Sequence, residues 1–176
     1  MTLAFVPPPL HRIGLRIAHA VRKRWWRLAR PRLEGCRVLA IDEHGRVLLI
    51  RHSYGSGLWL PPGGGVKRGE DALVTGRREL REETGCDLLE AREVGLLEEP
   101  LHGAANRVHI IAGRAVGTPR ADEREVIAAA FFAPDALPPD MPAALRRGLP
   151  GWITAATAAD RPRAAAAPAP PPAPTA

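Results

Sequence analysis

The stretch from Gly64 to Cys86, GGVKRGEDALVTGRRELREETGC, constrains this chain more than any other part of the sequence. It contains three acids, Glu79, Glu82 and Glu83, spaced so that a helix would place them on one face. Carboxylates pointing into one small volume repel each other, and burial raises that cost. A divalent cation would offset the repulsion. Carboxylates that leave room for water and phosphate oxygens suit Mg²⁺ or Mn²⁺ better than Zn²⁺.

The same stretch carries signals for both ends of a helix. Asp71 is a suitable N-cap residue, and Gly85 stands where a left-handed C-terminal residue is expected. Leu73, Gly76 and Leu80 form an apolar stripe opposite the acids. A glycine inside a helix costs about 1 kcal/mol relative to alanine. Close packing against a sheet would explain why Gly76 occupies this position.

A run of charged residues is most often a solvated helix face, but the spacing here argues against that interpretation. From Gly64 the pattern runs through Glu70, the triplet Arg78-Glu79-Leu80, the pair Glu82-Glu83, and Gly85. It resembles the Nudix box of the Nudix hydrolases at every fixed position. The seven charged and glycine residues of this pattern would coincide by chance in roughly 10⁻⁶ to 10⁻⁵ of such sequences.

This resemblance implies both a fold and an activity. The fold is α/β, an α/β/α sandwich with a mixed sheet. Nudix hydrolases split a nucleoside diphosphate linked to another moiety, with Mg²⁺ or Mn²⁺. At the matching positions Glu79, Glu82 and Glu83 would bind the metal, and Arg78 would hold Glu79 in place. Hydrolysis of a diphosphate needs neutralised phosphoryl charge and a positioned water, which these groups suit.

The general base varies within the family, and two interpretations stay open here. One is Glu79 itself. The other is a glutamate just before the predicted strand 126–132, where Glu125 is favoured over Glu123. The candidate catalytic set is therefore Arg78, Glu79 and Glu125.

Further candidates surround these groups. The backbone amides of Gly63, Gly64 and Gly65 are placed to position phosphates or metal-bound groups. Trp59 precedes this glycine loop and either flanks the substrate or belongs to the core, which is the commoner place for a lone tryptophan. Glu70 is interpreted as an anchor of the helix start first and as a ligand second.

Two other functions compete with a plain hydrolase. A non-catalytic Nudix-like binding or regulatory domain would usually lack some box carboxylates, and this chain keeps them all. A membrane- or RNA-associated enzyme is compatible with hydrolysis. Lys67 stands where many relatives have an acid, which bears on metal or substrate preference. The substrate stays open among nucleoside triphosphates, ADP-ribose, nucleotide sugars, dinucleoside polyphosphates and capped RNA ends.

The flanking sequence predicts a sheet around the box. Residues 36–52 read as a β-hairpin whose turn is Asp42–Gly45, which allows antiparallel pairing. Alternating strands and helices indicate an α/β domain. The remaining predicted elements are strands at 93–101, 107–116 and 126–132, the last of them buried, and a helix at 140–159 with Trp152 on its packed face.

The basic charge is concentrated at the start of the chain. Residues 1–37 carry nine of the 25 Arg and Lys residues and a single acid, whereas the rest is slightly acidic. Residues 10–30 have the spacing of an amphipathic helix. We expect it to dock on the domain. The less favoured alternatives are an anionic membrane surface, contacted by Trp25 and Trp26, or RNA.

Three regions follow from these patterns: a leader at 1–34, a Nudix domain at 35–159, and an Ala/Pro-rich tail at 160–176 that we expect to be disordered. Cys36 and Cys86 show neither metal spacing nor a disulfide framework. No apolar run is long enough for a membrane span or a signal peptide. A cytoplasmic location is the resulting expectation, and the oligomeric state stays open.

Overall fold

The computed structural model describes residues 32–159 except 102, 103 and 124, together with residues 14, 17, 18 and 21. Its elements in chain order are β1 (Arg32–Ile41), β2 (Val47–His52), β3 (Trp59–Leu60), α2 (Ala72–Thr84), β4 (Asp87–Leu101), β5 (Ala104–Val116), β6 (Val126–Phe132) and α3 (Ala143–Ala159). Within residues 32–159 every predicted strand and helix is present, with different limits for some of them.

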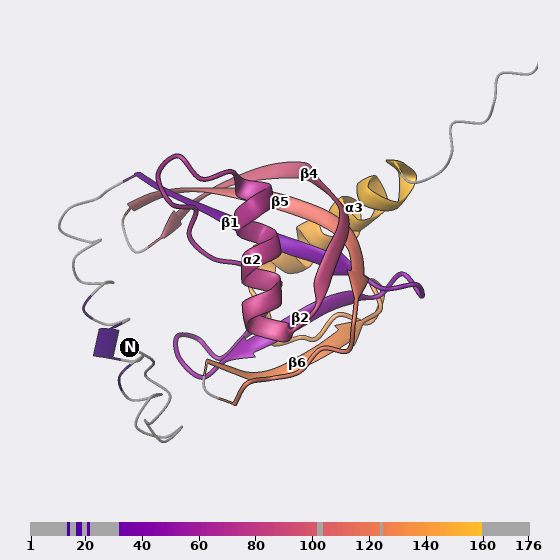
Figure 1. Ribbon diagram of the computed structural model, residues 1–176, viewed down its shortest axis with the longest axis horizontal. Coiled ribbons are helices and arrows are strands. Elements are labelled where there is room, and N and C mark those ends of the chain that lie inside the picture. Colours follow the sequence, from indigo (N-terminus) through magenta and orange to yellow (C-terminus); the bar gives the residue numbers. More distant parts are fainter. Residues whose placement is uncertain are drawn as a thin grey trace, which may run out of the picture.

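The strands form one mixed sheet, as the sequence predicts (Figure 1). The order is β3-β2-β1-β5-β4, and β6 pairs with β2. The β1–β5 pair is parallel, and the other pairs are antiparallel. The predicted hairpin joins β1 to β2 through a turn in which the Gly45 amide donates to the Asp42 carbonyl at 3.0 Å.

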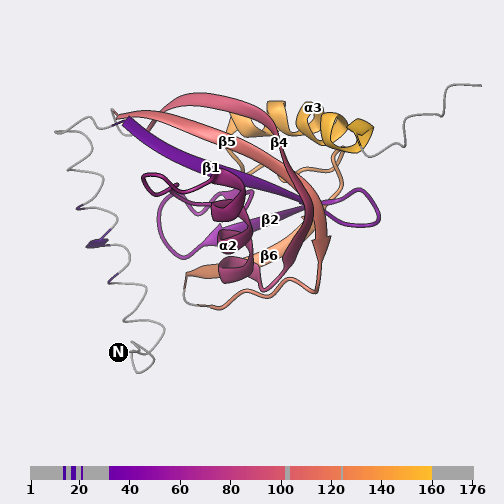
Figure 2. The same cartoon turned by 45° about the horizontal axis from the view of Figure 1, so that its top comes forward.

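The two described helices lie on opposite faces of the sheet (Figure 2). Alternate residues of β1 serve the two faces, because successive side chains of a strand point to opposite sides. Val38 packs in a buried cluster with Leu80 of α2, whereas Leu39 packs in a second cluster with Leu149 of α3. This arrangement confirms the α/β/α sandwich.

Helix α2 has the caps that its sequence predicts. The Asp71 carboxylate accepts from the Leu73 amide at 2.6 Å, and Gly85 closes the helix with a left-handed φ of 74°. Gly76 lies directly against the sheet. A Cβ at this position would come within 2.8 Å of Ile111 Cδ1 and 3.2 Å of Val38 Cγ2. Close packing therefore explains the glycine.

Several limits differ from the sequence prediction. β1 begins at Arg32, so the boundary expected between residues 34 and 35 falls inside a strand. β4 begins at Asp87, six residues earlier than expected, because it pairs with the far end of β5 at Val116. The prediction of a buried strand at 126–132 is wrong in its burial. Only Val126 is fully buried, because β6 pairs with β2 alone.

Helix α3 packs as expected on its face of the sheet. Trp152 is partly buried against the cluster that contains Leu39 and Leu149, which we call the α3-side cluster. Its indole lies over Gly95 of β4, where a Cβ would come within 3.1 Å of Trp152 Nε1. A larger residue at this position of β4 would displace the tryptophan, so the glycine permits the close contact between helix and sheet.

Most of the predicted leader helix, the segment before it and the tail at 160–176 lie outside the described residues. Within the leader, residues 14, 17, 18 and 21 are helical. Ile17 and Val21 are on the predicted apolar stripe, but they are 61% and 65% exposed. The rest of this stripe, with Trp25 and Trp26, lies outside the described residues, so docking of the helix on the domain stays a prediction. No helix among the described residues is long and apolar enough to cross a membrane.

Candidate active site

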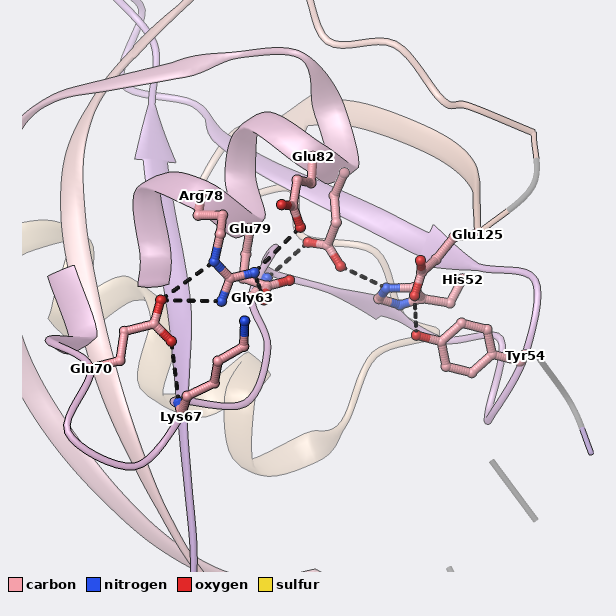
Figure 3. A network of polar contacts seen from close by, with 10 residues as sticks. His52, Tyr54, Gly63, Lys67, Glu70, Arg78, Glu79, Glu82 and Glu125 are labelled. Atoms are coloured by element: carbon pink, nitrogen blue, oxygen red, sulfur yellow. Dashed lines mark hydrogen bonds and ion pairs between the residues drawn. The ribbon is translucent and has the colours of Figure 1, made fainter. Parts of the chain in front are cut away.

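Arg78 lies at the centre of the acids on α2. Its Nη1 donates to Glu79 Oε1 at 2.7 Å and to Glu82 Oε2 at 3.3 Å (Figure 3). Its Nε contacts Glu70 Oε1 at 3.4 Å. Arg78 therefore holds three carboxylates from one side of the helix, including the Glu79 carboxylate that the sequence predicts as its partner.

Glu70 connects this group to the preceding loop. Its second oxygen, Oε2, accepts from the Lys67 amide at 3.3 Å. Burial favours a higher pKa for Glu70, but the Lys67 amide and the Arg78 guanidinium outweigh it and lower the pKa. Asp71, not Glu70, caps the helix. Glu70 thus anchors the helix start by linking Arg78 to the loop.

Glu79 is a half-buried acid whose pKa is raised by its surroundings. Burial raises its pKa, and the nearby charges of Glu83 and Glu82 raise it further, while Arg78 opposes them. The backbone of Gly64 passes directly against its carboxylate. A Cβ at Gly64 would come within 2.6 Å of Glu79 Cδ. Only glycine leaves space for the carboxylate in this position.

Glu83 is held apart from Arg78, in a more buried place. Its side chain is 8% exposed. Oε2 accepts from the Gly63 amide at 2.9 Å, and Oε1 lies 2.9 Å from His52 Nε2. The Gly63 amide, predicted to face a phosphate, is thus used to hold Glu83. His52 was not singled out by the sequence.

The glycine loop is fixed by its pairing with β1. The Cys36 amide donates to the Gly64 carbonyl at 2.9 Å, and Gly65 forms an isolated bridge with Gly35. Gly63 has a φ of 149°, and a Cβ there would clash with the Cys36 carbonyl. The loop therefore follows the strand closely enough to bring its backbone to the acids of α2.

Glu125 joins the site through two aromatic rings. The Tyr54 hydroxyl donates to Glu125 Oε1 at 2.6 Å, and the Tyr54 ring centroid is 5.1 Å from that of His52 (Figure 3). Glu123 lies instead in a turn with φ 59°, where its amide donates to the Val126 carbonyl at 2.9 Å. Of the two base candidates before β6, Glu125 is the one linked to the α2 acids.

A family comparison supplies the observation that decides the assignment. The model of the NUDIX domain matches residues 31–152. The chain belongs to the NUDIX family. This match covers the glycine loop, α2, Glu125 and most of α3, so the site described above lies inside the NUDIX domain.

Individual relatives agree with this family. A curated protein, m7GpppN-mRNA hydrolase NUDT17 from Xenopus laevis, is 37% identical; the match covers 56% of this chain but only 40% of that protein. A MutT NUDIX hydrolase structure from Burkholderia pseudomallei has a TM-score of 0.60 and 29% identity, covering 67% of this chain and 95% of that one. The MutT protein structure from Methanosarcina mazei Go1 has the same TM-score at 20% identity, covering 76% and 98%, and so shows the shared fold.

Trp59 lies away from the acids of this NUDIX domain. It packs against the α3-side cluster, with its ring centroid 4.9 Å from that of Phe132 in an edge-to-face contact. The Arg51 guanidinium lies 5.3 Å from the centre of its ring. The structure therefore places Trp59 as the core alternative expects.

The acids of the NUDIX site fit a hard divalent cation by their chemistry. Carboxylate oxygens are the ligands that Mg²⁺ and Mn²⁺ prefer. Within the described ranges, no three His, Cys, Asp or Glu side chains gather closely enough to hold a metal as they stand. Glu79 and Glu82 face Arg78 instead. Burial raises the pKa of Glu79, and the charges of Glu83 and Glu82 add to the rise; a cation would relieve the repulsion between these acids.

Proposed function

We propose that this chain is a metal-dependent hydrolase that splits the diphosphate bond of a nucleoside diphosphate linked to another moiety. The observation that carries the proposal is the set of three acids on α2 beside a glycine loop: Arg78 holds Glu79 and Glu82, and the Gly63 amide holds Glu83. Membership of the NUDIX family supports it, as does the fold shared with a MutT NUDIX hydrolase.

Glu79, Glu82 and Glu83 would hold the divalent cation. When bound, the cation supplies neutralisation of the phosphoryl oxygens and a more acidic water. The Glu82 side chain is 61% exposed and makes only a long contact with Arg78, so it is free to reorient. Glu83 is buried and already fixed by the Gly63 amide. One ligand is thus preorganised, and another is adjustable.

The remaining groups would handle the water and the proton. The water oxygen attacks one phosphorus, its proton passes to a carboxylate, and the bond from that phosphorus to the bridging oxygen breaks. Glu79 is the first candidate to accept the proton, since Arg78 fixes its carboxylate beside the other acids. Glu125 is the second candidate, since Tyr54 orients it beside the acids. Arg78 keeps Glu79 in one orientation while the charge changes.

One substrate class has a specific observation in its favour. The similar protein from Xenopus laevis is an m7GpppN-mRNA hydrolase. Capped RNA 5′ ends therefore stand beside nucleoside triphosphates, ADP-ribose, nucleotide sugars and dinucleoside polyphosphates as substrates to test. The basic segment 10–30 would give such an enzyme an additional contact with RNA or with an anionic membrane. We favour a small nucleoside diphosphate derivative as the partner over either of these contacts.

The deciding experiment measures hydrolysis of the diphosphate bond in each of these substrate classes, with Mg²⁺ and with Mn²⁺. In Glu82→Gln and Glu83→Gln we expect metal-dependent turnover to fall by about 100-fold or more while the melting temperature stays within a few degrees, because the amide keeps the size but weakens metal binding. Glu43→Gln, in the exposed β1–β2 turn, is the matched control. Normal turnover in both variants with unchanged metal dependence would remove the assignment, and no turnover by the native chain would favour the non-catalytic domain.

A further inference from the structure

His52 and Tyr54 stand two residues apart where β2 ends, and they contact two acids that come from distant parts of the chain. His52 lies against Glu83 of α2, and Tyr54 against Glu125, which precedes β6. Their rings lie 5.1 Å apart between centroids, tilted by 44°. The pair therefore links the metal-ligand candidate on the helix to the base candidate on the other side of β2.

The contact between His52 and Glu83 is enclosed. The two side chains are 12% and 8% exposed. When the Glu83 carboxylate is ionised it only accepts hydrogen bonds, and the His52 tautomer with the proton on Nε2 then donates to Oε1 over 2.9 Å. The Gly63 amide donates to the other oxygen. With one donor on each oxygen, Glu83 is held in a single rotamer.

The pairing of β2 with β6 is irregular where His52 lies. The register shifts between Arg51 and His52, and the extra residue, Ile127, is on β6. Such irregularities in a ladder redirect side chains and are frequent beside active sites. Directly after the shift, the Ser53 amide donates to the Glu125 carbonyl at 2.8 Å. Glu125 is thus held at its backbone by one residue of this segment and at its carboxylate by the next.

We propose that His52 and Tyr54 are positioning residues that fix Glu83 and Glu125 relative to each other in the reaction centre. The inference rests on the proposed hydrolysis for its chemistry, but it concerns residues outside the box. A glutamate has three rotatable bonds, and ordering it at the moment of reaction costs entropy. The two rings provide that order in advance. Removing partners that orient metal ligands typically costs about 10- to 100-fold in metal affinity or activity.

Tyr54 is tested by removing its hydroxyl alone. In Tyr54→Phe we expect kcat to fall by about tenfold with little change in KM, because the ring stays while the hydroxyl that orients Glu125 is lost. Ser56→Ala is the matched control, since it removes a hydroxyl from the same loop that makes a long contact, 3.4 Å, with the Leu58 amide. The decisive measurement is the double variant with Glu125→Gln.

If Tyr54 acts through Glu125, Tyr54→Phe has almost no further effect once Glu125→Gln is present. An equal fold-loss in both backgrounds would overturn the role of Tyr54. An unchanged kcat in Tyr54→Phe, with the control also unchanged, would do the same.

His52 is tested without turnover, by titrating Mn²⁺ into the full chain and following free Mn²⁺ by electron paramagnetic resonance. In His52→Leu we expect Mn²⁺ affinity to fall by about tenfold, because Glu83 loses its donor. His52→Gln restores a donor at similar reach and is expected to regain most of the affinity. His44→Gln, on the exposed turn, is the control. Equal affinities in the leucine and glutamine variants would overturn the role of His52.

The two readouts separate this inference from the proposed function. Hydrolysis by the native chain with no effect of the Tyr54 or His52 variants refutes the positioning roles alone. Mn²⁺ binding that depends on His52 without any hydrolysis refutes the proposed activity but keeps the role of His52. A native chain that neither binds Mn²⁺ nor hydrolyses any substrate refutes both.

Discussion

The two faces of the sheet are built from alternate residues of the same strands, and they differ in what covers them. On the α3 face, Leu39, Ile110 and Leu149 belong to a cluster of apolar side chains. On the α2 face an apolar cluster is also present, but the helix above it turns its other side to the glycine loop and carries the acids. One face therefore supplies stability, and the other carries a charged site on top of its core.

The largest effect expected from this difference is on stability, from Leu149→Ala. Leu149 is fully buried in the α3-side cluster. We expect the free energy of unfolding to fall by about 2–5 kcal/mol, because the substitution leaves a cavity. Activity per folded molecule stays unchanged. Urea denaturation and turnover measure the two quantities, and Leu89→Ala, at a 43% exposed leucine, is the control. A matching loss of turnover per folded molecule would break the division between the faces.

On the α2 face, Gly64→Ala should lower activity and leave stability nearly unchanged. The new methyl group would lie within 2.6 Å of Glu79 Cδ and would displace the carboxylate. A misplacement of about 1 Å can cost roughly 100-fold in rate, so we expect kcat/KM to fall by about that factor with a small change in melting temperature. Gly151→Ala, which meets nothing within 4 Å, serves as the control. Retained activity in Gly64→Ala would show that the loop and Glu79 are not in contact during turnover.

The smallest effect concerns His109 on β5, which bridges the two neighbouring strands. Its ring nitrogens lie 2.9 Å from Glu34 and 2.9 Å from Glu93. Burial lowers the pKa of His109, but these two carboxylates outweigh it and raise the pKa above 6.5. His109 thus stabilises the fold at pH values below its pKa in the unfolded chain. This stabilisation is lost as the pH rises through its pKa in the folded chain. Glu34 and Glu93 are both about half exposed, so we expect these contacts to contribute less than about 1 kcal/mol to the free energy of unfolding.

This is measured as the stability difference between the native chain and His109→Gln from pH 5.5 to 8.5. The difference should shrink as pH rises. His44→Gln, whose ring is 65% exposed, should show no such trend. A difference that grows with pH would contradict the assigned direction of the shift.

The sequence predicted the helix of the site better than its surroundings. Asp71, Gly76 and Gly85 act through local backbone geometry or a single close contact, which a sequence can indicate. His52 and Tyr54 were missed because nothing near them in the chain distinguishes them. Their partners, Glu83 and Glu125, come close only when β6 has paired with β2 and α2 lies against the sheet. The one available signal is their place where a strand runs into a glycine-containing loop.

The burial of β6 and the limits of β4 were mispredicted for a related reason. Whether a strand has neighbours on both sides, and how far its partner extends, depends on the whole sheet. β6 has an apolar sequence but pairs with β2 only, and Ile127 is 44% exposed as a result. β4 extends back to Asp87 because β5 continues to Val116.

The parallel pairing of β1 with β5 has a consequence for the order of folding. β1 meets its hairpin partner at one residue pair, Ile41 with Val47, but meets β5 along its whole length, from Arg32 beside Ala105 onwards. Contacts between residues so distant in sequence form slowly, because a long loop must close first. The glycine loop rests on β1. The reaction centre is therefore completed only after the chain has passed β5, so a nascent chain that ends earlier carries every acid of the box without the surface that aligns them.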